Sequence, residues 1–177
     1  MILDWREATK GDRLLLQRFE CTTPPPREPG RRAQPHPKPY EYDVQKAIHT
    51  LNLPLHGDDG TVLLGLGPDG SLGAISVWSS IRAHPGLHKI RLIAVSLAYR
   101  GASADQGVAG AAASETLDVT LTRLGSYAAG ERVFGLVDHR NTGSLRLLRA
   151  HGFVHLPTGP VDDPYLQMWA ARVPGRA

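Results

Sequence analysis

The chain has 177 residues, enough for one domain with a hydrophobic core and too few for two. Apolar residues make up 41% of the chain and charged residues 21%, which is the composition of an ordinary globular protein. The net charge is +3, and Lys and Arg do not cluster as they do on a nucleic-acid-binding face. We therefore expect a single domain over residues 1–177 and no nucleic-acid partner.

The cysteine content and the hydropathy pattern bear on the compartment. A single cysteine, Cys21, excludes an internal disulfide and fits a reducing environment. No apolar run reaches the length of a membrane-spanning helix, and the first residues lack the apolar segment of a signal peptide. The sequence therefore predicts a cytoplasmic protein with no membrane partner, and it leaves a homodimer open.

The first forty residues contain two short elements and a proline-rich loop. Ile2–Glu7 alternates as a strand does, and Asp12 is placed to cap a short helix over Arg13–Glu20. Seven prolines between Thr22 and Pro39 exclude both a helix interior and a central strand. Long loops in compact domains are either functional or disordered, so this segment is either a functional lid or a disordered loop.

The middle and the end of the chain are predicted from periodicity and turn signals. Val44, Ile48 and Leu51 share one helical face, and Pro68-Asp69-Gly70 is a turn signal between two apolar segments. The expected elements are a helix over Tyr40–Leu51, a link over Asn52–Gly60, a hairpin of Thr61–Gly67 and Ser71–Ile81, a loop over Arg82–His88, a strand over Lys89–Val95, and after Phe153 a short strand, a loop over Pro157–Pro164 and a last strand over Tyr165–Arg172.

Between Leu92 and Phe153 the pattern is strand, loop, helix, strand, helix, which predicts a parallel βαβ unit followed by a further helix. The crossover is expected to be right-handed, so the loop lies at the carboxyl ends of both strands. The parts are an apolar run over Leu92–Val95, a small-residue loop over Arg100–Gly107, a helix with Leu117, Leu121 and Leu124 on one face, a strand over Val133–Val137 and a helix from Asn141.

The small residues of that loop predict a site for an anion. Without bulky side chains, backbone N–H groups can approach a ligand closely. The next helix directs its N-terminus, which carries a partial positive charge, at the same place. Phosphate groups are the expected ligands. The alternative is that these residues simply end one strand and begin one helix.

The segment VDHRNTGSLRLLRAHGF resembles the acetyl-CoA-binding signature of the GNAT-type N-acetyltransferases, and VSLAYRG before it resembles the start of that family's pyrophosphate loop. The resemblance implies an α/β fold with a mixed, mostly antiparallel sheet, a central splayed parallel pair and flanking helices. In the family, the splayed strands bind the pantetheine arm of acetyl-CoA. The residues at matching positions are Asn141, Ser144, Leu145, Leu147, Gly152 and Phe153.

The pyrophosphate loop can be placed twice, as RGASAD from Arg100 or as QGVAGA from Gln106. The second placement keeps Ala109 and Ala111 at the small-residue positions and runs directly into the helix, so we prefer it. The resemblance then implies a cofactor site made of Ile93, Ala94, Val95, Arg100, Gly101, Gln106, Gly107, Val108, Ala109, Gly110, Ala111, Asn141, Ser144 and Leu148.

Catalytic groups are less clear from the sequence. Many relatives have a tyrosine at the position of Leu148 that protonates the departing thiolate, and leucine cannot do this. Asn141 is expected to cap its own helix and to lie near the cofactor, and Ser144 is either a small packing residue or a weak donor to the thiolate. The candidates for a base that takes the amine proton are His84, His88, His139 and Glu41, of which His139 is the best placed.

The leading hypothesis is an N-acetyltransferase that moves an acetyl group from acetyl-CoA to a primary amine of a small molecule or of a peptide or protein. The amine attacks directly in a ternary complex, and proximity supplies much of the rate. The alternatives are a CoA-binding module without catalysis and a nucleotide-phosphate-binding protein of another kind.

Overall fold

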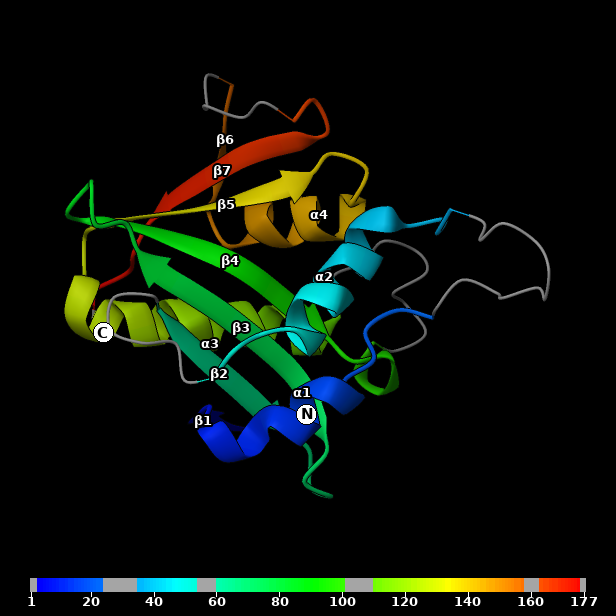
Figure 1. Ribbon diagram of the computed structural model, residues 1–177. Helices are drawn as coiled ribbons and strands as arrows, with labels where there is room; N and C mark the ends of the chain where they lie inside the picture. The colour runs from blue at the N-terminus through cyan, green and yellow to red at the C-terminus, as the bar shows by residue number, and fades with distance from the viewer. Residues whose placement is uncertain (1–2, 24–34, 54–59, 101–109, 158–162, 176–177) are drawn as a thin grey trace.

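The computed structural model describes residues 3–23, 35–53, 60–100, 110–157 and 163–175 (Figure 1). Its seven strands form one sheet in the order β1-β2-β3-β4-β5-β7-β6. In chain order the elements are β1 (Asp4–Glu7), η1 (Lys10–Asp12), α1 (Arg13–Arg18), α2 (Pro39–His49), β2 (Thr61–Leu66), β3 (Leu72–Ser80), β4 (Leu87–Val95), η3 (Leu97–Tyr99), α3 (Ala111–Ala128), β5 (Arg132–Asp138), α4 (Thr142–Ala150), β6 (Val154–Leu156) and β7 (Leu166–Arg172).

The strand pairing confirms the predicted mixed sheet. Among the described strands, β4 and β5 pair in parallel and every other neighbouring pair is antiparallel. Helix α3 connects the two parallel strands, as the βαβ pattern predicts. Helices α1 and α2 cover one face of the sheet, and α3 and α4 cover the other (Figure 1).

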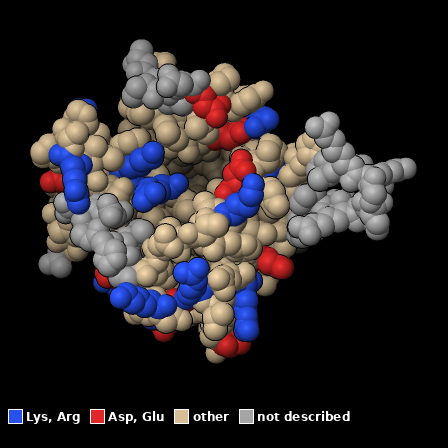
Figure 2. Space-filling view, in the orientation of Figure 1, with Lys and Arg blue, Asp and Glu red and all other residues tan. Residues whose placement is uncertain are grey.

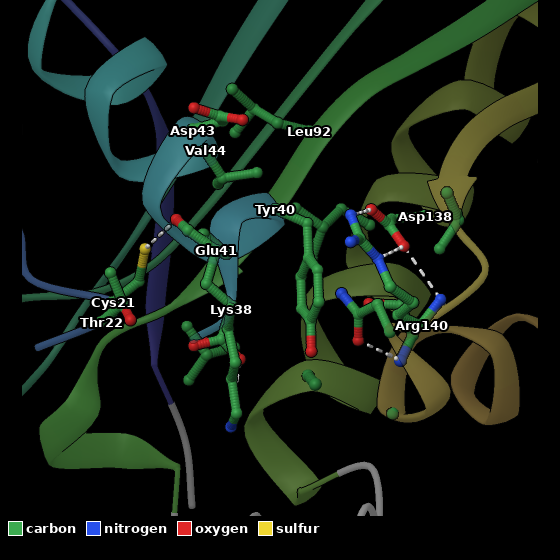
Figure 3. Close-up of a pocket in the computed structure, with 18 of the residues that line it drawn as sticks. Cys21, Thr22, Lys38, Tyr40, Glu41, Asp43, Val44, Leu92, Asp138 and Arg140 are labelled. Carbon is green, nitrogen blue, oxygen red and sulfur yellow. Dashed lines mark hydrogen bonds and ion pairs between the residues drawn. The ribbon is translucent and has the colours of Figure 1, made fainter. Parts of the chain in front are cut away.

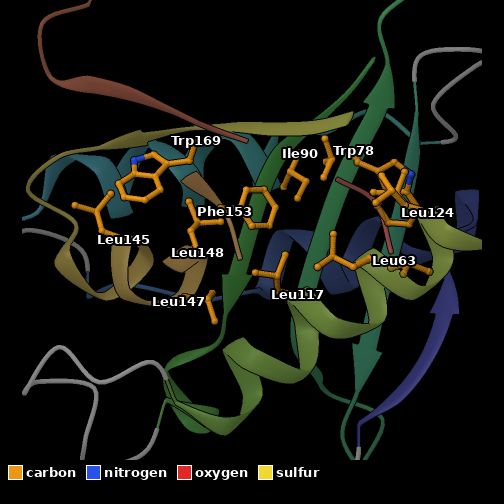
Figure 4. Packing of buried hydrophobic residues seen from close by; sticks show 13 residues of the cluster. Leu63, Trp78, Ile90, Leu117, Leu124, Leu145, Leu147, Leu148, Phe153 and Trp169 are labelled. Carbon is orange, nitrogen blue, oxygen red and sulfur yellow. The ribbon is translucent and has the colours of Figure 1, made fainter. Parts of the chain in front are cut away.

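Side-chain alternation along the strands divides the core between these two faces. In β2, Val62 and Leu64 pack against α1 and α2, whereas Leu63 between them packs on the α3 side. The larger cluster contains all three predicted leucines of α3 and continues into α4, Phe153 and β7 (Figure 4). Its fully buried members anchor the helices that border the cleft described below.

Several predicted boundaries are wrong by a few residues. Helix α2 begins at Pro39, because a proline is favourable in the first helical turn, where its missing N–H is not needed. Strand β4 begins at Leu87, so Leu87 and His88 are strand residues rather than part of the predicted loop; both pair with β5. Helix α1 ends at Arg18, before the predicted end.

Asp12 precedes α1 as predicted, but its carboxylate does not cap that helix. It accepts hydrogen bonds from the Thr9 backbone N–H at 2.7 Å and from both ends of the Arg6 guanidinium. These bonds close a capping box over the short η1 turn instead. None of the described helices is long and apolar enough to cross a membrane.

Candidate functional site

The two parallel strands separate halfway along their length. Their pairing runs from Leu87 and Arg132 to Ile90 and Gly135, and no later pair joins the described parts of β4 and β5. Both strands nevertheless continue, β4 beside β3 to Val95 and β5 beside β7 to Asp138. The inner backbone groups of both strands therefore face a gap, as the splayed pair predicted from the sequence requires.

The pairing on the outer sides shows which residues face this gap. The Ser96 N–H donates to the Gly73 carbonyl at 2.8 Å, and backbone direction alternates along an antiparallel pair. The backbone groups of Ile93 and Val95 therefore face the gap, whereas those of Ala94 face β3. On the other strand, the His139 N–H donates to the Tyr165 carbonyl at 2.8 Å.

By the same alternation, the backbone of Asp138 faces the gap, and the backbones of Val137 and His139 face β7. The gap thus offers unpaired N–H and C=O groups on two opposing strands. An extended ligand with amide groups can bond to such an edge as a further strand would.

A cavity of about 1210 Å³ lies at this separation. Figure 2 shows the hollow near the middle of the face, with acidic and basic side chains around it. Its lining includes residues of α2, of the start of β7, and of the starts of α3 and α4. The predicted cofactor residues that line it are Ile93, Ala94, Val95, Arg100, Gly110, Asn141, Ser144 and Leu148.

The start of α3 fits an anionic ligand. Gly110 is the N-cap, its carbonyl accepts from the Ala113 and Ser114 N–H groups, and no side chain caps the helix. A Cβ atom at Gly110 would lie 3.1 Å from the Arg100 carbonyl oxygen, so a larger residue would crowd the turn. The predicted residues Gly101, Gln106, Gly107, Val108 and Ala109 lie outside the described residues, and Ala111 opens the helix with an exposed side chain.

Solved structures share this architecture over nearly their whole length. A Desulfovibrio desulfuricans protein assigned to the GNAT family of acetyltransferases aligns with a TM-score of 0.66 at 15% identity, covering 97% of this chain and 99% of its own. The chain has the GNAT acetyltransferase fold. Nourseothricin acetyltransferase aligns at 0.61 with 14% identity, covering 98% of this chain and 100% of its own.

A Corynebacterium glutamicum structure described as histone acetyltransferase HPA2 and related acetyltransferase aligns at 0.58 with 18% identity, covering 100% of this chain and 98% of its own. No protein-family model and no curated protein matches the sequence. At these identities the likeness establishes the GNAT fold, and the chemistry has to be argued from the residues of the cleft.

Asn141 and Ser144, both predicted cofactor residues, lie at the start of α4. The Asn141 side-chain oxygen accepts a hydrogen bond from the Ser144 backbone N–H at 3.1 Å, which confirms the predicted helix cap. Both residues line the cavity, so the cap is also part of its wall. Leu148, one turn further along α4, is 7% exposed and belongs to the hydrophobic core, which makes this wall apolar.

Arg100 has partners that the sequence did not reveal. Its Nη1 lies 3.1 Å from Glu41 Oε1, and its Nε donates to the Val95 carbonyl at 3.4 Å. Lys38 Nζ lies 3.6 Å from the same Glu41 oxygen. Arg100 therefore connects α2 to the end of β4, and Glu41, one of the predicted bases, forms ion pairs with two cations.

A second charged pair lies at the end of β5. The Asp138 carboxylate accepts from the Arg140 backbone N–H and side-chain Nε, both at 2.9 Å, and from Nη2 at 2.6 Å. These bonds from Arg140 lower the pKa of Asp138 below its usual value, so the carboxylate is ionised at neutral pH. Arg140 also lies 4.3 Å from the centre of the Tyr165 ring.

The three predicted histidine bases are not brought into the cleft. His139 is exposed and stacks on Tyr165 with 6.0 Å between ring centres, and it is absent from the described residues that line the cavity. His84 and His88 are absent from the same lining, and His88 lies near the start of β4, where it contacts Glu131 at 2.6 Å and Ser80 at 3.2 Å.

Cys21 lines the cavity but is a poor nucleophile. Its side chain is 1% exposed, and burial raises the pKa of its thiol to about 11. Among the described residues, no group of three or more His, Cys, Asp and Glu side chains is arranged to hold a metal ion. The polar groups that line this cleft include hydroxyls, carboxylates, guanidinium groups, the Lys38 ammonium, the His36 imidazole and the Asn141 amide.

Proposed function

We propose that this protein is an acyl-CoA-dependent N-acetyltransferase that moves the acetyl group of acetyl-CoA to a primary amine of a small molecule or a peptide. The observation that carries the proposal is the separation of β4 from β5 after Ile90 and Gly135, with a cavity at the gap. Together with the GNAT fold, this arrangement provides a binding edge for an amide-containing arm and a space beside it for an acceptor.

The residues of the cleft fit the parts of acetyl-CoA. The backbone groups of Ile93 and Val95 would bond to the amides of the pantetheine arm. The start of α3, with Gly110 and the preceding loop from Gln106, would take the diphosphate, because helix N-termini favour anions. Asn141 and Ser144 would contact the arm near the thioester from α4.

The acceptor would enter between α2 and the end of β5. Its neutral nitrogen attacks the thioester carbonyl carbon, so that a C–N bond forms and the C–S bond breaks. The amine proton leaves to water in the open cleft or to a carboxylate, of which Glu41 and Asp43 line the cavity. Holding both substrates in one cleft supplies much of the rate by orientation alone.

The second candidate function is a CoA-binding module without catalysis. Leu148 favours it, because this position lacks a hydroxyl that could protonate the departing thiolate. The open cavity beside the gap favours the enzyme, since a binding module needs no space for an acceptor.

Release of free thiol from acetyl-CoA, followed over a panel of amines with and without the protein, separates the two functions. We expect amine-dependent release with matching formation of acetylated amine. In parallel, acetyl-CoA and CoA should raise the melting temperature, because a ligand that binds only the native state stabilises it. ATP and NAD should not raise the melting temperature. Stabilisation by CoA without turnover on any amine would favour the binding module. No stabilisation at millimolar ligand would contradict both functions.

A further inference from the structure

Three tyrosines line the cavity: Tyr40, Tyr99 and Tyr165. The Tyr99 hydroxyl packs against Gly67, at 1.9 Å from the position that a Cβ atom would take there, so it points to the β2–β3 turn. The Tyr165 ring is 49% exposed and lies between Arg140 and His139 at the start of β7. The Tyr99 hydroxyl is therefore not directed at the strand gap, and of the other two tyrosines Tyr40 is the less exposed.

Tyr40 follows Pro39 in the first turn of α2 and reaches across the cleft. Figure 3 shows its ring between Lys38 and Glu41 on one side and the Asp138–Arg140 pair on the other. Asp138 is the residue whose backbone faces the gap from β5. The Tyr40 ring therefore lies between helix α2 and the point where β4 and β5 separate.

The position of Tyr40 is held by its neighbours. Glu41, the next residue, is tied to Arg100 at 3.1 Å, which fixes the first turn of α2 against the end of β4. Within the described part of the chain, the Tyr40 hydroxyl has no hydrogen-bond partner, so its proton is available to a ligand. A partly buried phenol that is held in place and has a free proton is suited to act as a general acid.

The environment of Tyr40 also favours the protonated form of its phenol. Burial raises the pKa of Tyr40, and the nearby carboxylates of Glu41 and Asp138 raise it further. At neutral pH the phenol is therefore fully protonated. The hydroxyls that α4 contributes to the cavity, those of Thr142 and Ser144, are aliphatic and much weaker acids than a phenol.

We propose that Tyr40 is the general acid of the acetyl transfer, and that it replaces the hydroxyl which α4 lacks at Leu148. The inference rests on the proposed function. As the C–S bond breaks, the phenol proton passes to the departing sulfur and yields the free thiol of CoA. The phenolate then regains a proton from water, so that protons balance over one turnover.

Tyr40→Phe tests this role, because it removes the hydroxyl and keeps the ring. We expect kcat to fall about a hundredfold, as is usual for loss of a general acid. The KM values for acetyl-CoA and for the amine, and the rise in melting temperature with CoA, should stay within about twofold. The matched control is Tyr42→Phe on the same helix, whose ring stacks on His36 at 5.4 Å and which should keep wild-type kcat.

A second measurement follows the proton itself. Replacement of Tyr40 by 3,5-difluorotyrosine lowers the phenol pKa by electron withdrawal and leaves the shape nearly unchanged. Turnover should then acquire a fall on the alkaline side that follows ionisation of the phenol, which a purely structural role would not produce.

The outcomes separate this inference from the proposed function. Retention of kcat within about threefold in Tyr40→Phe would overturn the acid assignment and leave the acetyltransferase intact. A raised KM for the amine with unchanged kcat would also overturn it, since Tyr40 would then only bind the acceptor. If the wild-type protein releases no thiol with any amine, the proposed function fails and the acid role fails with it.

Discussion

The guanidinium group of Arg100 lies 3.1 Å from the carboxylate of Glu41, and this ion pair connects two sides of the cleft. Arg100 follows β4 and η3 and is the first residue of the predicted small-residue loop, whereas Glu41 lies on α2 beside Tyr40. The two side chains are 25% and 15% exposed, so the pair is partly desolvated. This one interaction therefore connects the end of β4 to the first turn of α2.

Breaking this pair should affect acceptor binding more than folding. In Arg100→Gln we expect the KM for the amine to rise several-fold and the free energy of unfolding to fall by about 1 kcal/mol, because a partly buried hydrogen-bonded pair is lost. Arg91→Gln, which removes another arginine that lines the cavity, serves as the control for charge.

A double-mutant cycle with Glu41→Gln, measured by urea unfolding, should give a coupling free energy of about 1 kcal/mol between Arg100 and Glu41. Additive effects of the two substitutions would show that the pair does not stabilise the fold.

Asn141 should show a structural effect and a ligand effect that can be separated. Asn141→Ala removes the oxygen that accepts from the Ser144 N–H, so we expect a loss of about 1 kcal/mol in unfolding free energy. Asn141→Asp keeps that oxygen and should retain stability. Both variants should bind CoA more weakly by isothermal titration, because neither offers the amide N–H₂ group. If Asn141→Asp binds CoA with wild-type affinity, the Asn141 side chain caps the helix and does not bind the ligand.

His139 provides a test of the base that the sequence favoured. Since its ring is exposed on Tyr165 and does not line the cavity, we expect His139→Gln to keep turnover within about threefold of wild type. The pH–rate profile should also keep its ascending limb. A loss of about a hundredfold, with loss of a limb near pH 6.5, would instead establish His139 as the base.

Asp12 should make the stability depend on pH. Bonds from Arg6 lower the pKa of its carboxyl well below the usual value, so its contribution is present above the unfolded-state pKa of about 3.9 and is lost as pH falls below it. In Asp12→Asn we expect a loss of about 1–3 kcal/mol at pH 7, since the Arg6 charge loses its partner. The difference from wild type, measured by urea unfolding, should shrink steadily from pH 5 to pH 3. A constant difference would contradict this role.

Features that depend on neighbouring residues were predictable from the sequence. Asn141 caps α4 because its side chain reaches an N–H three residues later, whatever the rest of the fold does. The leucines of α3 share a face because of the helical period, and Gly70 takes the positive φ of 76° that the β2–β3 turn requires. The mixed sheet followed from a βαβ pattern and a family resemblance, both of which are properties of segments.

The catalytic side of the cleft depended on contacts between distant segments. Arg100 and Glu41 are 59 positions apart in the sequence, and no local pattern marks either as the partner of the other. Whether His139 faces the cleft depends on its register with β7, because a strand turns each successive residue to the opposite side. Tyr40 enters the cavity only because α2 packs over the point where β4 and β5 separate. The sequence by itself therefore determined the elements, the helix cap and the parallel pair of strands, whereas only the tertiary structure decided which side chains meet at the gap, because that depends on strand register and helix packing.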